Sequence, residues 1–174
     1  MLSRVPPVVN FGPVITAADA RRVAPGAQSS RRRLPAGGTA VPMATREEIA
    51  DELAGMTLFA DLASAQLIGV ASRFEEAWFP QGERVLRQGL SGSAFYVILD
   101  GEAAIIVDGA QRATLGRGEF FGEVSILLGE PPSADVVAVR PLRCLALPGV
   151  EIEPFMVAHP KVMFRMLQDR KSVV

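Results

Sequence analysis

Regularly spaced glycines between residues 82 and 129 constrain the fold of this 174-residue chain more than any other feature. Glycine accepts backbone angles that other residues avoid, so it commonly marks turns. Many short strands separated by turns at intervals of roughly 8–12 residues predict a β-sandwich, a jelly roll or a small barrel. The short apolar stretches between and after the glycines are Val85–Leu86, Ala94–Leu99, Ala103–Val107, Ala113–Leu115, Val136–Val139 and Cys144–Leu147.

Two Asp-Gly pairs strengthen this prediction. Asp100-Gly101 and Asp108-Gly109 are strong turn signals, because tight hairpin turns need residues that tolerate a positive φ. The strand-like pattern begins near Trp78 and gives way to a helical pattern after Pro148. We therefore expect a mainly β domain with helices on both sides of the strands in the sequence.

The helical pattern before the strands starts with a capping box. Thr45 is followed three residues later by Glu48, and each side chain can bond the other residue's backbone N–H. Apolar residues then recur on one helical face, and a second helix is predicted over Ala63–Phe74. The apolar residues of the two faces are Ile49, Leu53 and Met56, and Leu67, Val70, Ala71 and Phe74. We interpret both faces as core packing, and a surface for a partner helix is the alternative.

A break is predicted in the helical pattern after the strands. Proline removes a backbone donor and disfavours helical angles in the residue before it, so the helix should break or bend at His159-Pro160. We accordingly expect His159 to end a helix. The apolar residues on the two sides of the break are Ile152, Phe155 and Met156, and Val162, Met163, Met166 and Leu167.

The first 45 residues differ in composition from the rest. They hold six arginines and one aspartate, and are rich in proline, glycine, alanine and serine. Such a segment buries too little apolar surface to offset the entropy cost of ordering. We expect a disordered basic tail over 1–45 and a folded domain over 46–174. A transit peptide and a contact arm for an acidic partner or anionic surface are the alternatives.

Overall composition excludes several function classes. A formal charge of −1 argues against direct DNA binding, which favours a basic face. With one cysteine and one histidine the chain lacks the residues for an intrachain disulfide, a multi-cysteine zinc site or the histidine cluster of cupin enzymes, so no metal is expected. No apolar run approaches the roughly 18 residues of a membrane span. Without a visible nucleophile–base pair, we expect a non-enzymatic, cytoplasmic protein.

Three single residues are interpreted as structural. Cys144 lies in an apolar run and is expected to be a small buried side chain; a reactive thiol would need an exposed, electropositive site. Trp78 and Tyr96 are expected to be core or rim aromatic residues.

The stretch GEFFGEVSILLGEPPSADVVA, from Gly118 to Ala138, resembles the phosphate-binding cassette of cyclic nucleotide-binding domains. This family includes the catabolite activator protein, the regulatory subunits of cAMP-dependent protein kinase and cyclic nucleotide-gated channels. The resemblance implies a cyclic nucleotide-binding β-roll, similar to a double-stranded jelly roll, flanked by helices. Three further segments resemble the family in the expected order: LFADL at Leu58–Leu62, FPQGERVLRQG at Phe79–Gly89 and AFYVILDGEAAI at Ala94–Ile105.

The resemblance also implies a set of site residues. In the family, backbone N–H groups at a short helical turn hold the phosphate, an acidic side chain accepts a bond from the ribose 2′-OH, and an arginine grips the phosphate. Glu123 matches the ribose partner, and Ser133 and Ala134 match the small residues that face the phosphate. The site residues implied are Gly122, Glu123, Val124, Ser125, Ser133 and Ala134.

The arginine of the cassette is missing. The family pattern Pro-Arg-Ser/Ala-Ala reads Pro131-Pro132-Ser133-Ala134 here, so Pro132 replaces the cation. Loss of one partner of a buried charge pair costs roughly 2–5 kcal/mol, so cAMP or cGMP is expected to bind weakly. Arg140 or Arg143 could replace it from a neighbouring strand; the alternative is that both are ordinary surface charges.

These residues favour a cyclic nucleotide-binding-type regulatory module that acts in trans on an effector protein not identified by the sequence. The family's last helix closes over the base, and here about eleven residues from Pro160 to Arg170 match it, or about 16 Å. The alternative is a degenerate module that serves as a protein-interaction unit without nucleotide.

Overall fold

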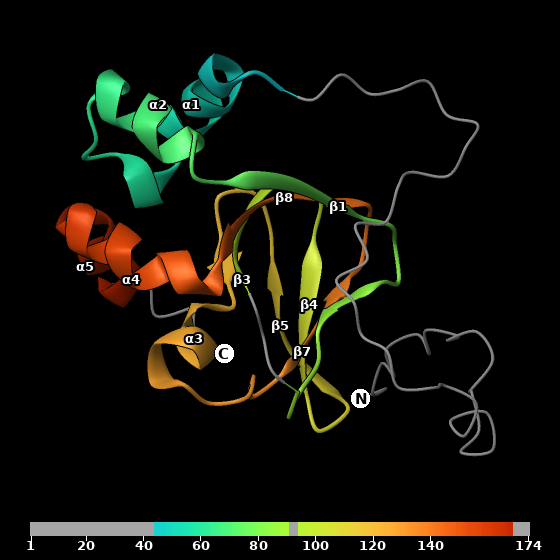
Figure 1. Cartoon of the computed structure of the whole chain (residues 1–174). Coiled ribbons are helices and arrows are strands. Elements are labelled where there is room, and N and C mark those ends of the chain that lie inside the picture. Colours follow the sequence, from blue (N-terminus) through green and yellow to red (C-terminus); the bar gives the residue numbers. More distant parts are fainter. Residues whose placement is uncertain (1–43, 91–93, 169–174) are drawn as a thin grey trace, which may run out of the picture. The chain divides into compact units, whose positions relative to one another are not determined.

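A computed structural model describes residues 44–90 and 94–168 (Figure 1), so the predicted tail over 1–45 lies almost wholly outside the described residues. The described helices are α1 (Arg46–Ala54), the single-turn 3-10 helix η2 (Thr57–Phe59), α2 (Ser64–Ala71), α3 (Glu123–Leu128), α4 (Gly149–Ala158) and α5 (Pro160–Gln168). The described strands are β1 (Glu75–Phe79), β2 (Arg84–Leu86), β3 (Ala94–Asp100), β4 (Ala103–Val107), β5 (Ala110–Leu115), β6 (Phe120–Phe121), β7 (Asp135–Ala138) and β8 (Leu142–Pro148).

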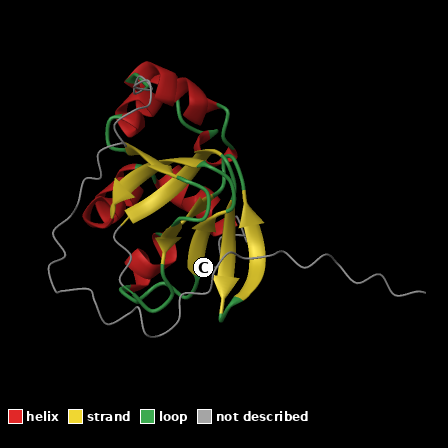
Figure 2. Cartoon of the chain, turned by 90° about the vertical axis from the view of Figure 1, so that its right-hand side faces the viewer, coloured by secondary structure: helices red, strands yellow, loops and turns green. Residues whose placement is uncertain are grey.

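The described strands form two four-stranded antiparallel sheets. Their strand orders are β1-β8-β3-β6 and β2-β7-β4-β5. Figure 2 shows the strands in the middle and right of the view, with helices above and to the left. The predicted fold class, a mainly β roll with flanking helices, is confirmed.

Side chains alternate between the two faces of β3 and contribute to two separate hydrophobic layers. Phe95, Val97 and Leu99 pack with residues of the helices, whereas Ile98, on the opposite face, packs in the interior of the roll. Successive side chains of a strand point to opposite faces, and here both faces are buried. The roll interior therefore lies between the sheets, and the helical layer covers the outer face of the first sheet.

The predicted capping box and turns are confirmed. The Thr45 hydroxyl accepts from the Glu48 backbone N–H at 3.2 Å, and the Glu48 carboxylate accepts from the Thr45 N–H at 2.7 Å. The hydrogen bond from the Thr45 backbone N–H to the Glu48 carboxylate, together with the Thr45 hydroxyl beside it, lowers the pKa of the Glu48 carboxyl. Between β4 and β5, Asp108 and Gly109 have φ of 51° and 77°, the left-handed angles of a tight hairpin turn.

Several sequence-based boundaries were wrong. The second helix is shorter than Ala63–Phe74, because the chain enters β1 at Glu75. β1 was not predicted, since its sequence EEAWF lacks the alternation of a half-buried strand. β6 has only two residues, too few for a periodicity signal.

The helix break at His159-Pro160 is confirmed, with His159 as the C-cap of α4. The apolar stripe predicted beyond it was wrong for half of its residues. Val162 and Met166 are buried, but Met163 and Leu167 are exposed.

An arginine-centred network ties α1 to the first sheet. Arg143 lies on β8, on the opposite face from the inward-facing Cys144. Its Nη1 donates to the Glu52 carboxylate at 2.9 Å, and its Nε donates to the carboxylate of Glu76. The guanidinium also lies 5.6 Å from the centroid of the exposed Trp78 ring. Glu76 is 4% exposed at its side chain, so its charge depends on Arg143 for compensation.

We expect Arg143→Gln to lower the free energy of unfolding by about 2–3 kcal/mol, because it leaves the Glu76 carboxylate buried without its cation. Urea unfolding followed by circular dichroism measures this loss. Arg140→Gln is the matched control: Arg140 pairs with Glu102 on the surface at 3.4 Å, so its loss should cost below about 0.5 kcal/mol. Equal losses for the two variants would contradict a structural role for the network.

The Cys144 side chain is expected to be inert in the folded protein. It is fully buried, and burial raises the pKa of its thiol to about 12. Because the thiolate is the reactive form, DTNB should not react with the native protein at about pH 8 but should label one thiol after denaturation. Rapid labelling of the native chain would show that the strand opens or that the thiol is accessible.

Candidate functional site

The segment that resembles a phosphate-binding cassette runs from β6 through α3 to β7 (Figure 1). Gly122 joins β6 to α3 with φ of 93°, a left-handed angle that L side chains rarely adopt. A Cβ at this position would lie 2.5 Å from the carbonyl oxygen of Ala94 on β3. Only glycine therefore lets the cassette pass this close to the central strand.

Hydrogen bonds at both ends fix the conformation of the short helix α3. The Ser125 hydroxyl donates back to the Gly122 carbonyl at 3.1 Å. At the other end, Gly129 has a φ of 67° and the Glu130 N–H donates to the Ser125 carbonyl at 3.0 Å. Glu123, in the first turn, is 5% exposed, an unusual position for a carboxylate.

The structure brings the sequence-predicted site residues together only in part. Four of them lie next to one another at the start of α3: Gly122, Glu123, Val124 and Ser125. Among these, Glu123 and Ser125 are buried and Val124 is half-buried. Ser133 is exposed in the loop before β7.

Ala134 is fully buried and packs with Phe121 and Val136 in the roll interior. Its side chain therefore contributes to the core.

Pro132, the residue in place of the arginine, is buried. Its carbonyl accepts a hydrogen bond of 2.9 Å from the Gly89 N–H, which joins the cassette loop to the segment after β2. A proline at this position offers neither a cation nor a backbone donor.

Both arginines suggested as replacements already form ion pairs with carboxylates of the chain. Arg140 is exposed and pairs with Glu102, as expected of an ordinary surface charge. The surface-charge interpretation was wrong for Arg143, whose side chain is 17% exposed and is held by Glu52 and Glu76 on the helix-covered face of the sheet. Strand parity places it on the opposite face from the roll interior.

Asp135, which sequence reasoning did not single out, adds a second carboxylate next to the cassette. It directly follows Ala134, accepts from the Gln88 N–H at 2.8 Å and lies 3.4 Å from an Arg84 guanidinium nitrogen. The Gln88 side chain in turn makes two hydrogen bonds to Asp108 in the β4–β5 turn. The signal available in the sequence was an acidic residue directly after the small residues of the segment that resembles a phosphate-binding cassette.

Aromatic rings fill part of the roll interior behind the cassette. Tyr96 stacks on Phe121 with ring centroids 5.0 Å apart, and Phe79 meets Tyr96 edge-on at 5.9 Å. Burial raises the pKa of the Tyr96 hydroxyl, because the ionised form is disfavoured away from water. The expectation that Tyr96 is a core or rim residue is confirmed, whereas Trp78 is half-exposed on the sheet and lies under Arg143.

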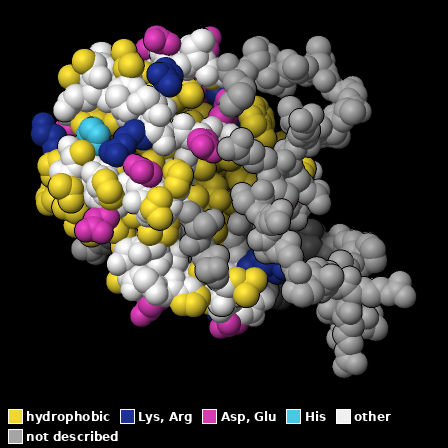
Figure 3. All heavy atoms as spheres, in the orientation of Figure 1, with side chains coloured by type: hydrophobic (Ala, Val, Ile, Leu, Met, Phe, Trp, Pro, Cys, Tyr) yellow, Lys and Arg dark blue, Asp and Glu magenta, His cyan; other side chains and the backbone are white. Residues whose placement is uncertain are grey.

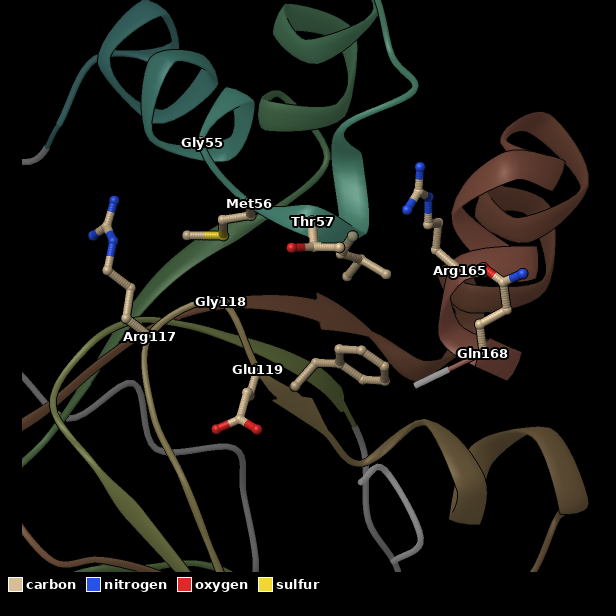
Figure 4. Close-up of a pocket in the computed structure, with 10 residues that line it drawn as sticks. Gly55, Met56, Thr57, Arg117, Gly118, Glu119, Arg165 and Gln168 are labelled. Carbon is tan, nitrogen blue, oxygen red and sulfur yellow. The ribbon is translucent and has the colours of Figure 1, made fainter. Parts of the chain in front are cut away.

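A pocket of about 580 Å³ lies on the helical side of the first sheet, and its lining includes none of the predicted site residues (Figure 4). Arg117 and Arg165 lie on opposite sides of it, with Thr57 between them. Arg165 is paired with Asp61 at 2.7 Å, and Arg117 donates to the Leu99 carbonyl at 2.6 Å. Both guanidinium groups therefore already donate hydrogen bonds to other groups of the chain. Sequence reasoning did not predict this pocket, because its lining comes from three separate segments.

Within residues 44–90 and 94–168, no three His, Cys, Asp or Glu side chains group closely enough to hold a metal ion. Over the same residues, the helices are too short or too polar to cross a bilayer.

Comparison with known proteins gives the same family from sequence and from structure. The sequence profile described as "cyclic nucleotide-binding domain" matches residues 76–159. Among solved structures, the catabolite activator protein of Thermus thermophilus is 32% identical with a TM-score of 0.58, over 64% of this chain and 55% of that one. A regulatory subunit of a cAMP-independent protein kinase A from Trypanosoma cruzi, bound to guanosine, is 25% identical with a TM-score of 0.63, over 74% of this chain and 48% of that one.

The regulatory domain of Toxoplasma gondii protein kinase A, crystallised with cAMP, is 23% identical with a TM-score of 0.62, over 72% of this chain and 49% of that one. At this identity the likeness supports the fold alone. The chain spans about half the length of each of these proteins. With the β-roll, the Gly122 turn and the α3 cassette, these matches make residues 76–159 a member of the cyclic nucleotide-binding domain family.

Proposed function

We propose that this chain is a cytoplasmic, non-enzymatic regulatory module whose affinity for cAMP and cGMP is weakened, and which acts on a separate effector protein. The observation that carries the proposal is the buried Pro132 in the position of the phosphate-gripping arginine. The other site residues, with Glu123 as the ribose partner, would still supply a pocket of the family's form.

The charge balance around the cassette supports weakened binding. A cyclic nucleotide carries a negative phosphate, and a cation of the protein is needed to offset that charge next to the carboxylates around the cassette. Arg84 is already paired with Asp135, and Arg143 with Glu52 and Glu76. Loss of the arginine then costs about 2–5 kcal/mol, which corresponds to about 30- to 4,000-fold in affinity.

Two structures of one relative support the same interpretation. The regulatory subunit from Trypanosoma brucei, 24% identical to this chain, belongs to a protein kinase A described as cAMP-independent. A triple mutant of that subunit, in which one of the substitutions introduces an arginine, has been crystallised with cAMP.

Calorimetric titration of cAMP and cGMP into the wild type and Pro132→Arg tests the proposal. We expect the variant to bind cAMP or cGMP at least about 30-fold more tightly than the wild type, since it restores the charge pair with the phosphate. Pro132→Ala separates loss of the proline from gain of the cation. Pro131→Arg is the matched control, because it places the same charge one residue earlier at an exposed position.

Each outcome has a distinct meaning. Tight binding by the wild type would contradict the proposal, because some other group must then replace the arginine. If Pro132→Arg folds but neither protein binds cAMP or cGMP, the result favours the alternative function. That alternative is a degenerate module that serves as a protein-interaction unit without nucleotide. Circular dichroism and the melting temperature establish that Pro132→Arg is folded.

Uncharged nucleosides are a second candidate ligand class. Glu123 is retained and would bond a ribose hydroxyl without any phosphate, and the Trypanosoma cruzi relative is bound to guanosine. On this hypothesis guanosine or adenosine binds the wild type more tightly than its cyclic monophosphate. Glu123→Gln should then weaken nucleoside binding by roughly 10- to 150-fold, because the charge-assisted hydrogen bond is lost. Equal affinity of the wild type and Glu123→Gln would exclude Glu123 as the ribose partner.

A further inference from the structure

The pocket on the helical side of the first sheet has the size of a small-molecule site. Its volume of about 580 Å³ lies within the range of about 300–1,000 Å³ that is usual for ligand pockets. Three segments line it: residues 55–58, which join α1 to η2, residues 117–120, which lead into β6, and Arg165 and Gln168 of α5. None of them is among the site residues predicted from the sequence, so the pocket is a second candidate site.

Two arginines lie on opposite sides of this pocket, and each keeps donors that the described part of the chain does not use (Figure 4). Arg117 donates through Nη1 to the Leu99 carbonyl, and Arg165 donates through Nε to Asp61. A guanidinium carries donors on each of its nitrogens. No described residue accepts a hydrogen bond from Nε or Nη2 of Arg117, or from either Nη of Arg165. Both side chains can therefore bind a further anion.

The acidic groups near Arg117 leave the pocket open to such an anion. Glu119 belongs to the lining, but its carboxylate accepts from the Gly116 N–H at 2.7 Å, and Figure 4 shows it pointing away from both arginines. Glu52 lies closer to Arg143, at 2.9 Å, than to Arg117, at 3.5 Å. Its charge is therefore shared between two cations.

The carboxylate on the other side of the pocket is shared in the same way. The hydrogen bond from Arg165 lowers the pKa of the Asp61 carboxyl, and the positive charges of Arg165 and Lys161 contribute to the same shift. One carboxylate cannot balance two cations, so positive charge remains at this end of the pocket.

This arrangement favours a small anion over a large polyanion. Nucleic acid and anionic membrane surfaces require a broad basic face. Figure 3 shows Lys and Arg side chains scattered singly over the visible face, among hydrophobic and acidic side chains. Two guanidinium groups on opposite sides of one pocket instead fit two acidic groups that a short organic chain holds apart.

We propose that this pocket binds a small organic dianion with an acidic group at each end. Arg117 holds one carboxylate or phosphate end and Arg165 holds the other, because the guanidinium fork matches the oxygens of either group. Thr57, which lies between the two arginines in Figure 4, offers a hydroxyl to the middle of the ligand. Since Arg117 precedes β6 and Arg165 lies on α5, the bound ligand ties α5 to the first sheet.

Calorimetric titration of the full chain with small anions tests the site. The probes are succinate, adipate and phosphoglycolate, with butyrate as the monoanion of the same chain length as succinate. We expect at least one dianion to bind with a Kd below about 2 mM at low salt, and at least about tenfold more tightly than butyrate. A preference among the three dianions identifies whether the end groups are carboxylates or a phosphate.

Substitutions in the lining assign the binding to this pocket. Arg117→Gln and Arg165→Gln should each weaken binding of the dianion at least about tenfold, because each removes a charge-assisted contact. Thr57→Val should weaken it about fivefold. This variant removes a hydroxyl without breaking an ion pair, so it tests the site even if an arginine variant fails to fold.

Arg73→Gln is the matched control. Arg73 forms an ion pair with Glu151 at 3.0 Å, its side chain is 34% exposed like that of Arg165, and it does not line the pocket. It should leave dianion binding unchanged, and circular dichroism should show which variants are folded. The proposal is overturned if no dianion binds with a Kd below about 2 mM, or if butyrate binds as tightly as the dianions. It is also overturned if the folded pocket variants bind the dianion as tightly as Arg73→Gln.

Discussion

Burial of β3 on both faces is the constraint on which the rest of the structure depends. One face of β3 packs against the helices through Phe95, Val97 and Leu99. The other face packs in the roll interior through Tyr96 and Ile98. A strand whose two faces are both covered cannot shift register by one residue without exchanging these two layers. The same strand supplies the Ala94 carbonyl against which Gly122 packs, so the position of the cassette follows from the position of β3.

Local signals made much of this fold predictable from the sequence. The capping box at Thr45, the Asp108-Gly109 turn and the break at His159-Pro160 depend on residues that are near one another in the chain, and the structure confirms all three. β1 and β6 could not be predicted in this way. β1 is a strand because it pairs with β8 from far along the chain, and β6 because β3 pairs with it.

The candidate site was predictable to a similar degree. The motif located a glycine turn at Gly122, an acidic residue at Glu123 and the missing cation at Pro132, whereas the burial of Glu123 is known only from the structure. The environment of Arg143 was not predictable, because Glu52 and Glu76 lie 91 and 67 residues away in the sequence. The burial of Pro132 against the Gly89 segment likewise depends on a contact between distant parts of the chain.

The position of Trp78 makes the protein its own optical reporter. It is the sole tryptophan of the chain, and the cation above its ring is held in place by Glu52 of α1. The emission of an indole depends on the charges and solvent around it. Any ligand or partner that shifts α1 against the first sheet would move the Arg143 guanidinium and change that emission. Rearrangement of the helices over the β-roll can therefore be followed in the unlabelled chain.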